Sequence, residues 1–124
     1  MVLTFANNET LIADYTTGDA VVTTDPVPVG NANQLYMVLN IHHLMPMGGS
    51  PSPSVGFVVE ESNDAQTWIV GGITQSRSSV GTAHTTGSVD CAFIRLKITH
   101  STGGSGAGEW SAATFDIHGN LKHS

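Results

Sequence analysis

A strictly alternating segment, residues 92–99, most constrains what this chain can fold into. Its even-numbered residues, Ile94 and Leu96 among them, are all apolar, whereas the odd-numbered residues include an arginine and a lysine. Because successive side chains of a strand point to opposite faces, this pattern predicts a strand with one buried face. We expect the strand to span residues 89–100 and to lie at the centre of a small antiparallel β-sandwich.

The segment before it has the pattern of a β-hairpin. Strand-forming residues at 58–59 and 68–70 flank Ser62, Asn63 and Asp64. These three side chains can hydrogen-bond to their own backbone, and Asn and Asp tolerate left-handed dihedral angles, so they can reverse the chain. Trp68, which follows the turn, is expected to pack under the hairpin.

Composition favours the same fold class. With 124 residues the chain is long enough for one domain, and a second domain would have no room. Charged residues make up only 11% of it, and Gly, Ser and Thr are abundant, which is typical of β-rich proteins with many tight turns. We therefore predict an all-β fold, an antiparallel jelly-roll-like β-sandwich of about seven to nine strands in a single domain, residues 1–124.

Residues 34–45 form the longest predicted strand, with apolar side chains at every odd position from Leu35 to Ile41. So long a strand is unusual in a small domain, and a bend or bulge near His42 and His43 would shorten it. Helix is the competing interpretation, because Leu and Met are good helix formers. Asn40 and the nearby prolines weaken it.

The remaining segments are assigned by their turn residues. The expected parts are an extended N-terminal arm (1–10), a proline-containing edge or crossover (25–30), a loop (45–54), a polar connection (75–88), a closing strand (110–118) and a polar tail (119–124). The 45–54 loop is rich in Pro and Gly and carries Met45 and Met47, so it is either a contact surface or a solvent-exposed connector.

Charge, cysteine content and the N-terminal residues narrow the partners. The formal charge is −6 and the four basic residues form no cluster, so we predict no nucleic-acid partner. Residues 1–7 include neither a basic region nor a long apolar segment, which predicts no secretion signal, no membrane partner and synthesis in a cytoplasm. Cys91 is the single cysteine; no basic residue adjoins it, so we expect a buried, inert thiol rather than a reactive one.

No motif predicts chemistry. His42 and His43 are adjacent on a strand and face apart unless the strand bulges, and no Cys-x-x-Cys or His-x-x-x-His spacing supports a metal site. Glu60 and Glu61 face apart for the same reason, which is wrong for a catalytic carboxylate pair. We therefore predict no catalytic residue, no cofactor, no metal and no enzyme activity. Trp110 begins a strand after a glycine-rich loop, where burial and exposure are both compatible with the pattern.

The strand and turn motifs carry a family resemblance. Glu61-Ser62-Asn63-Asp64 with Thr67-Trp68, followed by Phe93-Ile94-Arg95-Leu96, resembles the pattern of discoidin-like, galactose-binding-like jelly rolls. It also looks like a pattern in small β-sandwich proteins of tailed-phage virions. The resemblance covers residues 55–118. The ligand-binding loop residues of the sugar-binding members find no match here, and the cysteine pair of the secreted members is absent, which points away from an extracellular lectin.

The resemblance implies a non-enzymatic structural protein of a bacteriophage virion that decorates or reinforces the capsid. Its expected partner is the major capsid protein or another virion protein, and the chain itself is expected to form a homo-oligomer, with a trimer as one form. Residues 1–10 and the 45–54 loop are the predicted contact segments, with Phe5, Met45, Met47 and Trp110 as interface or ligand contacts. The alternative is a carbohydrate-binding module of a phage tail, fibre or cell-surface assembly.

Overall fold

The computed structural model describes residues 2–49, 51–104 and 106–123, and every regular element in them is a β-strand. The strands are β1 (Val2–Asp14), β2 (Ala20–Thr23), β3 (Val27–Pro28), β4 (Gln34–Met47), β5 (Ser54–Ser62), β6 (Ile69–Arg77), β7 (Gly81–Ser88), β8 (Phe93–Ser101) and β9 (Trp110–Lys122). The described residues contain no helix that is long and apolar enough to span a membrane.

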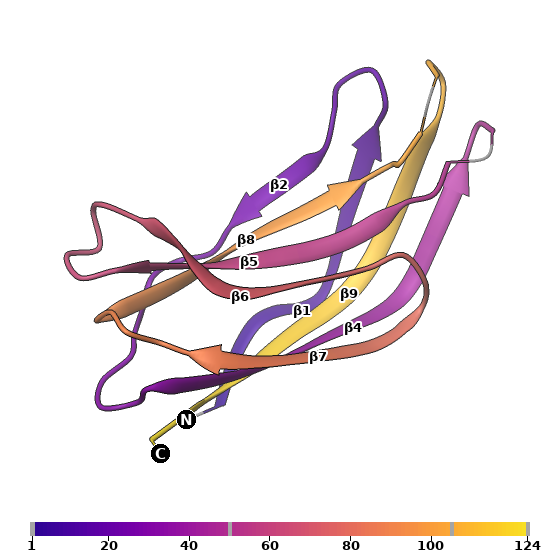
Figure 1. The fold of residues 1–124 in the computed structure, drawn as a ribbon. Coiled ribbons are helices and arrows are strands. Elements are labelled where there is room, and N and C mark those ends of the chain that lie inside the picture. The colour runs from indigo at the N-terminus through magenta and orange to yellow at the C-terminus, as the bar shows by residue number, and fades with distance from the viewer. Residues whose placement is uncertain (1, 50, 105, 124) are drawn as a thin grey trace.

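The strands form two antiparallel sheets that lie one over the other (Figure 1). One sheet, here the β9 sheet, has the order β1-β9-β4-β7; the other, the β8 sheet, has the order β2-β8-β5-β6, and β3 also pairs with β8. With β2 and β3 taken as successive segments on one partner, the chain passes between the sheets in the order of a jelly roll. The predicted fold class is therefore confirmed.

The core lies between the sheets and is made by the alternation seen in the sequence. On β4, the apolar odd-numbered residues from Leu35 to Ile41 are fully buried, and on β8 Ile94, Leu96 and Ile98 are buried opposite them. Burying such a side chain contributes roughly 1.5–3 kcal/mol to the free energy of unfolding. The strand interpretation of β4 is confirmed, and the helix alternative is wrong.

The bulge expected in β4 is present where two adjacent histidines stand. The register of β4 against β9 shifts between Ile41 and His43, so His42 is the extra residue. Beyond the bulge, β4 continues to Met47 and stays paired with β9. The loop predicted at residues 45–54 is correspondingly shorter, because Met45, Pro46 and Met47 belong to the strand.

Both chain ends differ from the sequence expectation. β1 pairs with β9 from Val2 to Asp14, so residues 2–10 belong to a sheet rather than to an extended arm. β9 runs on to Lys122, so the expected polar tail is strand up to that residue. Gly119 lies inside this strand because the packing leaves no room for a side chain. A Cβ there would lie 2.9 Å from the Met37 sulfur and 3.0 Å from Phe5 Cε2.

The segment 75–88, which the sequence predicted to be a polar connection, contains a further strand. β7 (Gly81–Ser88) pairs with β4 along its whole length, and β6 covers residues up to Arg77. Its inward side chains are small, and a Cβ on Gly87 would lie 2.7 Å from Ile73 Cγ1. Ile73 of the other sheet fills the space beside this edge strand. Its inward residues can therefore be small and polar.

Candidate functional site

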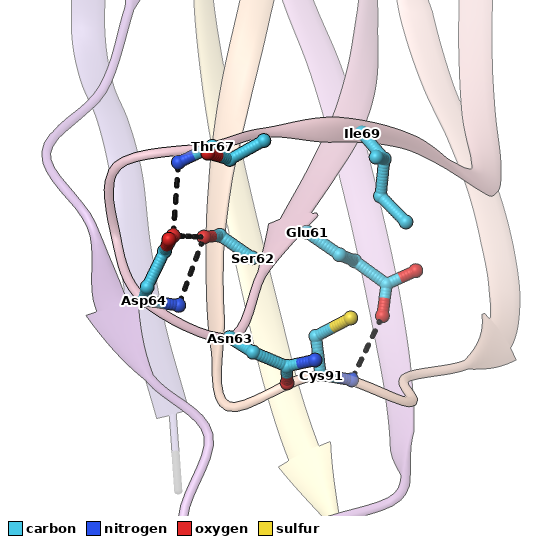
Figure 2. A pocket seen from close by; sticks show the side chains of 7 residues that line it. All are labelled: Glu61, Ser62, Asn63, Asp64, Thr67, Ile69 and Cys91. Carbon is cyan, nitrogen blue, oxygen red and sulfur yellow. Dashed lines mark hydrogen bonds between the residues drawn. The ribbon is translucent and has the colours of Figure 1, made fainter.

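The loop between β5 and β6 is folded by its own side chains (Figure 2). Ser62 Oγ accepts hydrogen bonds from the amides of Asp64 (3.2 Å) and Ala65 (2.9 Å) and donates to Asp64 Oδ1 (2.8 Å). The same carboxylate oxygen accepts the amides of Gln66 and Thr67, each at 2.9 Å. These donors, the backbone amides first, lower the pKa of Asp64 to about 2. Ser62 and Asp64 are thus confirmed as turn residues that bond to the local backbone, whereas the side chain of Asn63 bonds elsewhere.

Two neighbouring side chains tie this loop to the connection between β7 and β8. Glu61 Oε1 accepts the amide of Asp90 at 2.8 Å and that of Cys91 at 3.4 Å. Asn63 Oδ1 accepts the amide of Ala92 at 3.1 Å. Because these amides are used by side chains of the other loop, β8 begins at Phe93 rather than at residue 89, and Ala92 is exposed rather than facing the core.

A pocket of about 270 Å³ opens between the two loops, lined by Glu61, Ser62, Asn63, Asp64, Thr67, Ile69 and Cys91. Cys91 is half-buried, and desolvation, followed by the nearby Glu61 and Asp90 carboxylates, raises the pKa of its thiol. A raised pKa disfavours the reactive thiolate. Since Glu61, Asn63 and Asp64 each bind backbone amides, the residues around this pocket hold the loops together.

Trp68 lies outside the core, contrary to the expectation that it packs under the hairpin. It is half-buried, and the Arg95 guanidinium carbon stands 4.3 Å from its ring centroid. Arg95 Nε also donates to Glu60 Oε1 at 2.8 Å. Because Arg95 lies on the outer side of β8, opposite the buried Ile94 and Leu96, it draws the tryptophan onto the outer face of the β8 sheet.

The outer face of the β9 sheet gathers several histidines without forming a metal centre among the described residues. His42 Nε2 lies 2.7 Å from Asp116 Oδ2, and His118 Nε2 lies 4.0 Å from the same oxygen. The amide of Asn8, a residue with positive φ in a β1 bulge, donates to Asp116 Oδ1. This amide first, and then His42, lowers the pKa of Asp116.

The structure brings together three of the four predicted contact residues. Met47 pairs with Trp110 and Met45 pairs with Ala112 across β4 and β9, and Ile12 of β1 pairs with Ala112 from the other side. All of these side chains lie on the outer face, because the odd-numbered residues of β9 are buried in the core. Ile12, Met45, Met47, Trp110 and Ala112 thus form one patch, here called the contact patch.

The contact patch is exposed and apolar. Ile12 is 64% exposed, Met45 53% and Met47 41%, and Trp110 is half-buried. Phe5 lies elsewhere: it packs against the core beside Gly119, toward the other end of β9. Ile12 was missed from the sequence because it sits next to the half-buried Leu11 and only the register with β9 shows which face it takes.

The comparisons with known proteins concern the fold. No family model matches the chain, and no curated protein matches its sequence. Among solved structures, the exported protein XepA of PBSX superposes with a TM-score of 0.62 at 8% identity, over 100% of this chain and 37% of that one. VP2 of infectious bursal disease virus, solved as a subviral particle, gives 0.58 at 16% identity, over 99% and 32% of the two chains.

The similarity extends to proteins of other kinds. Tripeptidyl peptidase 2 superposes with a TM-score of 0.55 at 11% identity, over 98% of this chain and 10% of that one. This chain spans about a third of the length of XepA and VP2. At such identities the similarity establishes the fold alone, so the chain is a single jelly-roll domain whose fold is shared with proteins of viral particles.

Proposed function

We propose that this chain is a non-enzymatic structural protein of a bacteriophage virion that decorates or reinforces the capsid through its contact patch. The contact patch is the observation that carries the proposal. Exposed, contiguous apolar side chains on a small domain mark interaction sites, and Met and Trp are enriched in protein interfaces. Its partner is the major capsid protein or another virion protein, and the protein resides in the virion.

The fold supports the proposal at the level of architecture. Jelly rolls are common in viral capsid proteins, and VP2 of infectious bursal disease virus, which superposes on the whole sandwich, comes from a subviral particle. Attachment by such a patch is weak for one copy and strong for several copies on one shell, since linked contacts raise the apparent affinity without new interactions. The discoidin-like relationship of residues 55–118 stays a prediction.

Co-sedimentation tests the proposal. Empty shells of the virion to which we assign the protein are mixed with the purified protein and pelleted. We expect the wild type to pellet with the shells and Ile12→Asp to stay in solution, because the variant buries a charge at the interface. Ile69→Asp is the matched control, since Ile69 is also exposed (59%) but lies away from the contact patch, at the pocket between the β5–β6 loop and the β7–β8 connection.

Two results would overturn the proposal. Wild-type protein that stays in solution at every shell concentration shows that the capsid is not its partner. Equal loss of pelleting for Ile12→Asp and Ile69→Asp shows that the contact patch is not the contact.

Carbohydrate binding is the second candidate, because Trp110 stands half-exposed on the outer face beside Met47 and a tryptophan face can stack on a sugar ring. A glycan array separates the two functions. Reproducible binding to one sugar family that Trp110→Ala abolishes would replace the capsid contact with a sugar site.

A further inference from the structure

The free edge of β7 differs from the other sheet edges in the described residues. β7 pairs with β4 from Gly81 to Ser88 without a register shift. β1 has two shifts, β6 has one, β2 has only four residues, and β3 has two residues and contains Pro28. Bulges, prolines and short lengths are the devices by which proteins prevent edge strands from pairing with other chains. β7 has none of these three devices, and the Gln75 side chain of β6 covers one of its outward carbonyls, that of His84.

The hydrogen-bonding direction of β7 follows from two contacts. The amide of Val89 donates to the carbonyl of Asn33 at 3.0 Å, which continues the β4 ladder and sets the odd-numbered residues of β7 toward β4. The carbonyl of His84 accepts Gln75 Nε2 at 3.0 Å from outside that ladder. The backbone groups of the even-numbered residues therefore face the open edge; these residues are Thr82, His84, Thr86 and Ser88, and their side chains are exposed.

Charge makes this edge suitable for a second copy of the same chain. The protein carries a formal charge of −6, so two copies repel each other over most approaches. Neither β7 nor its neighbour β4 contains an Asp, Glu, Lys or Arg. Two copies that meet along β7 therefore bring together neutral strands, with His84 as the titratable side chain of each.

We propose that two copies of this chain pair antiparallel along β7, through the outward backbone groups of Thr82, His84, Thr86 and Ser88, about a two-fold axis. An isologous two-fold contact uses the same strand on both copies, and one antiparallel ladder closes it. Gln75 occupies only one of the two lone pairs of the His84 carbonyl, which leaves the other for the partner strand.

The proposed pairing adds to the proposed function, on which its biological use rests. A two-fold axis perpendicular to the joined sheets keeps the outer faces of both β9 sheets on the same side. Residues Met45 and Met47 lie beyond the part of β4 that β7 covers, so pairing leaves both contact patches open. The dimer would hold a shell at two points, and self-pairing can be measured with no shell present.

Light scattering and sedimentation velocity, run from about 10 µM to about 1 mM protein, test the pairing. We expect the mass of the wild type to rise with concentration from 12.9 kDa toward twice that value. Thr86→Pro removes an outward amide without touching the β4 ladder, and it should raise the dissociation constant at least about tenfold. Thr86→Lys, which places a charge on each copy beside the axis, should do the same if the proline variant fails to fold.

Thr23→Pro is the matched control on the edge of the other sheet. The amide of Thr24 donates to the carbonyl of Leu96, so Thr23 points its amide away from β8, as Thr86 does from β4. This variant should dimerise like the wild type. Amide hydrogen exchange should show Thr82, His84 and Thr86 becoming protected as concentration rises.

Three results would overturn the pairing. They are a wild-type mass that stays monomeric over the whole range, a mass three times that of the chain, and a dimer that Thr86→Pro and Thr86→Lys leave intact. Normal pelleting on shells with a monomeric protein would refute the pairing and keep the proposed function. A dimer that never pellets would refute the function and keep the pairing.

Discussion

Ala65 stands in a backbone conformation that an alanine adopts with strain. Its φ is 59°, in the left-handed region, within the turn that Ser62 and Asp64 hold by hydrogen bonds. A Cβ in this region raises the energy by about 1–2 kcal/mol, and glycine has no Cβ. The turn thus keeps its shape because the surrounding hydrogen bonds outweigh this strain.

Ala65→Gly should therefore stabilise the protein. We expect the free energy of unfolding to increase by about 1 kcal/mol in urea denaturation, because relief of strain exceeds the extra chain entropy of glycine. Ala83→Gly in the middle of β7 is the control and should decrease it by about 0.5–1 kcal/mol. A loss of stability at position 65 as large as that at position 83 would show that the turn carries no strain.

Asp64 makes the stability depend on acid. Its folded-state pKa is about 2, below the ordinary 3.8, so its carboxylate stabilises the fold above pH 3.8 and this contribution disappears as the pH falls toward 2. We expect the Tm of the wild type to fall over that window and the Tm of Asp64→Asn to fall less. Asp19→Asn, at an exposed position of the β1–β2 connection, should follow the wild type. Parallel curves for wild type and Asp64→Asn would contradict this.

The roles of Ser62 and Asp64 could be predicted from the sequence because they act within four residues of themselves. Those of Glu61 and Asn63 could not. Both bind amides of residues 90–92, about thirty positions away, and only the folded sheet brings the two loops together.

At the scale of elements, β9 continues through Gly119, although a glycine in the sequence usually indicates the end of a strand. We expect Gly119→Ala to lower the free energy of unfolding by about 1–3 kcal/mol, since its Cβ would press on Met37 and Phe5. Gly72→Ala on β6, where nothing lies within 4 Å of the new carbon, should change it by less than about 0.5 kcal/mol. Denaturant titration measures both. Equal effects at the two glycines would show that the packing at Gly119 is loose.

Strands with an apolar face of their own could be predicted from the sequence. The strand that was not predicted, β7, has small inward side chains that are covered by a residue of the opposite sheet. β4 and β8 alternate in their own sequence, so their existence and facing followed directly. β7 is small and polar, and its inward residues are covered by Ile73 of the other sheet. The sequence pattern of β7 itself carries no sign of a residue that packs on it from the opposite sheet.

At the scale of the whole molecule, the buried His100 joins the two sheets. It lies on β8, with Nδ1 3.0 Å from the Ser54 carbonyl and Nε2 2.9 Å from the Ser111 hydroxyl on β9. Nδ1 donates to the Ser54 carbonyl, and Nε2 contacts Ser111 at both its hydroxyl oxygen and, at 3.2 Å, its carbonyl oxygen. The bond therefore crosses the core from one layer to the other.

His100→Leu should lower the free energy of unfolding by about 1–3 kcal/mol, because the Ser54 carbonyl and the Ser111 hydroxyl would then lose their buried partner. His43→Leu, at an exposed position on β4, should change it by less than about 0.5 kcal/mol. Thermal and urea unfolding provide the measurement. Unchanged stability of His100→Leu would mean that water replaces the histidine at no cost.

The contact patch also belongs to this scale. Met45, Met47 and Trp110 were predicted one by one, but their neighbourhood and the membership of Ile12 depend on the register of three strands from distant parts of the sequence. Phe5 is also a large apolar residue, but it packs against the core near the other end of β9. Residue chemistry identified the candidates, and sheet pairing decided which of them form one surface.

The course of β9 has a consequence for what this domain can carry. The strand begins at Trp110, in the contact patch, and ends at Lys122, about 40 Å away, where Val2 pairs with Asn120 beside it. A polypeptide joined before Val2 or after Lys122 would leave the sandwich at the end remote from the patch. Under the proposed function, a fluorescent protein or an antigen attached at either position would be displayed on a shell without covering the contact patch.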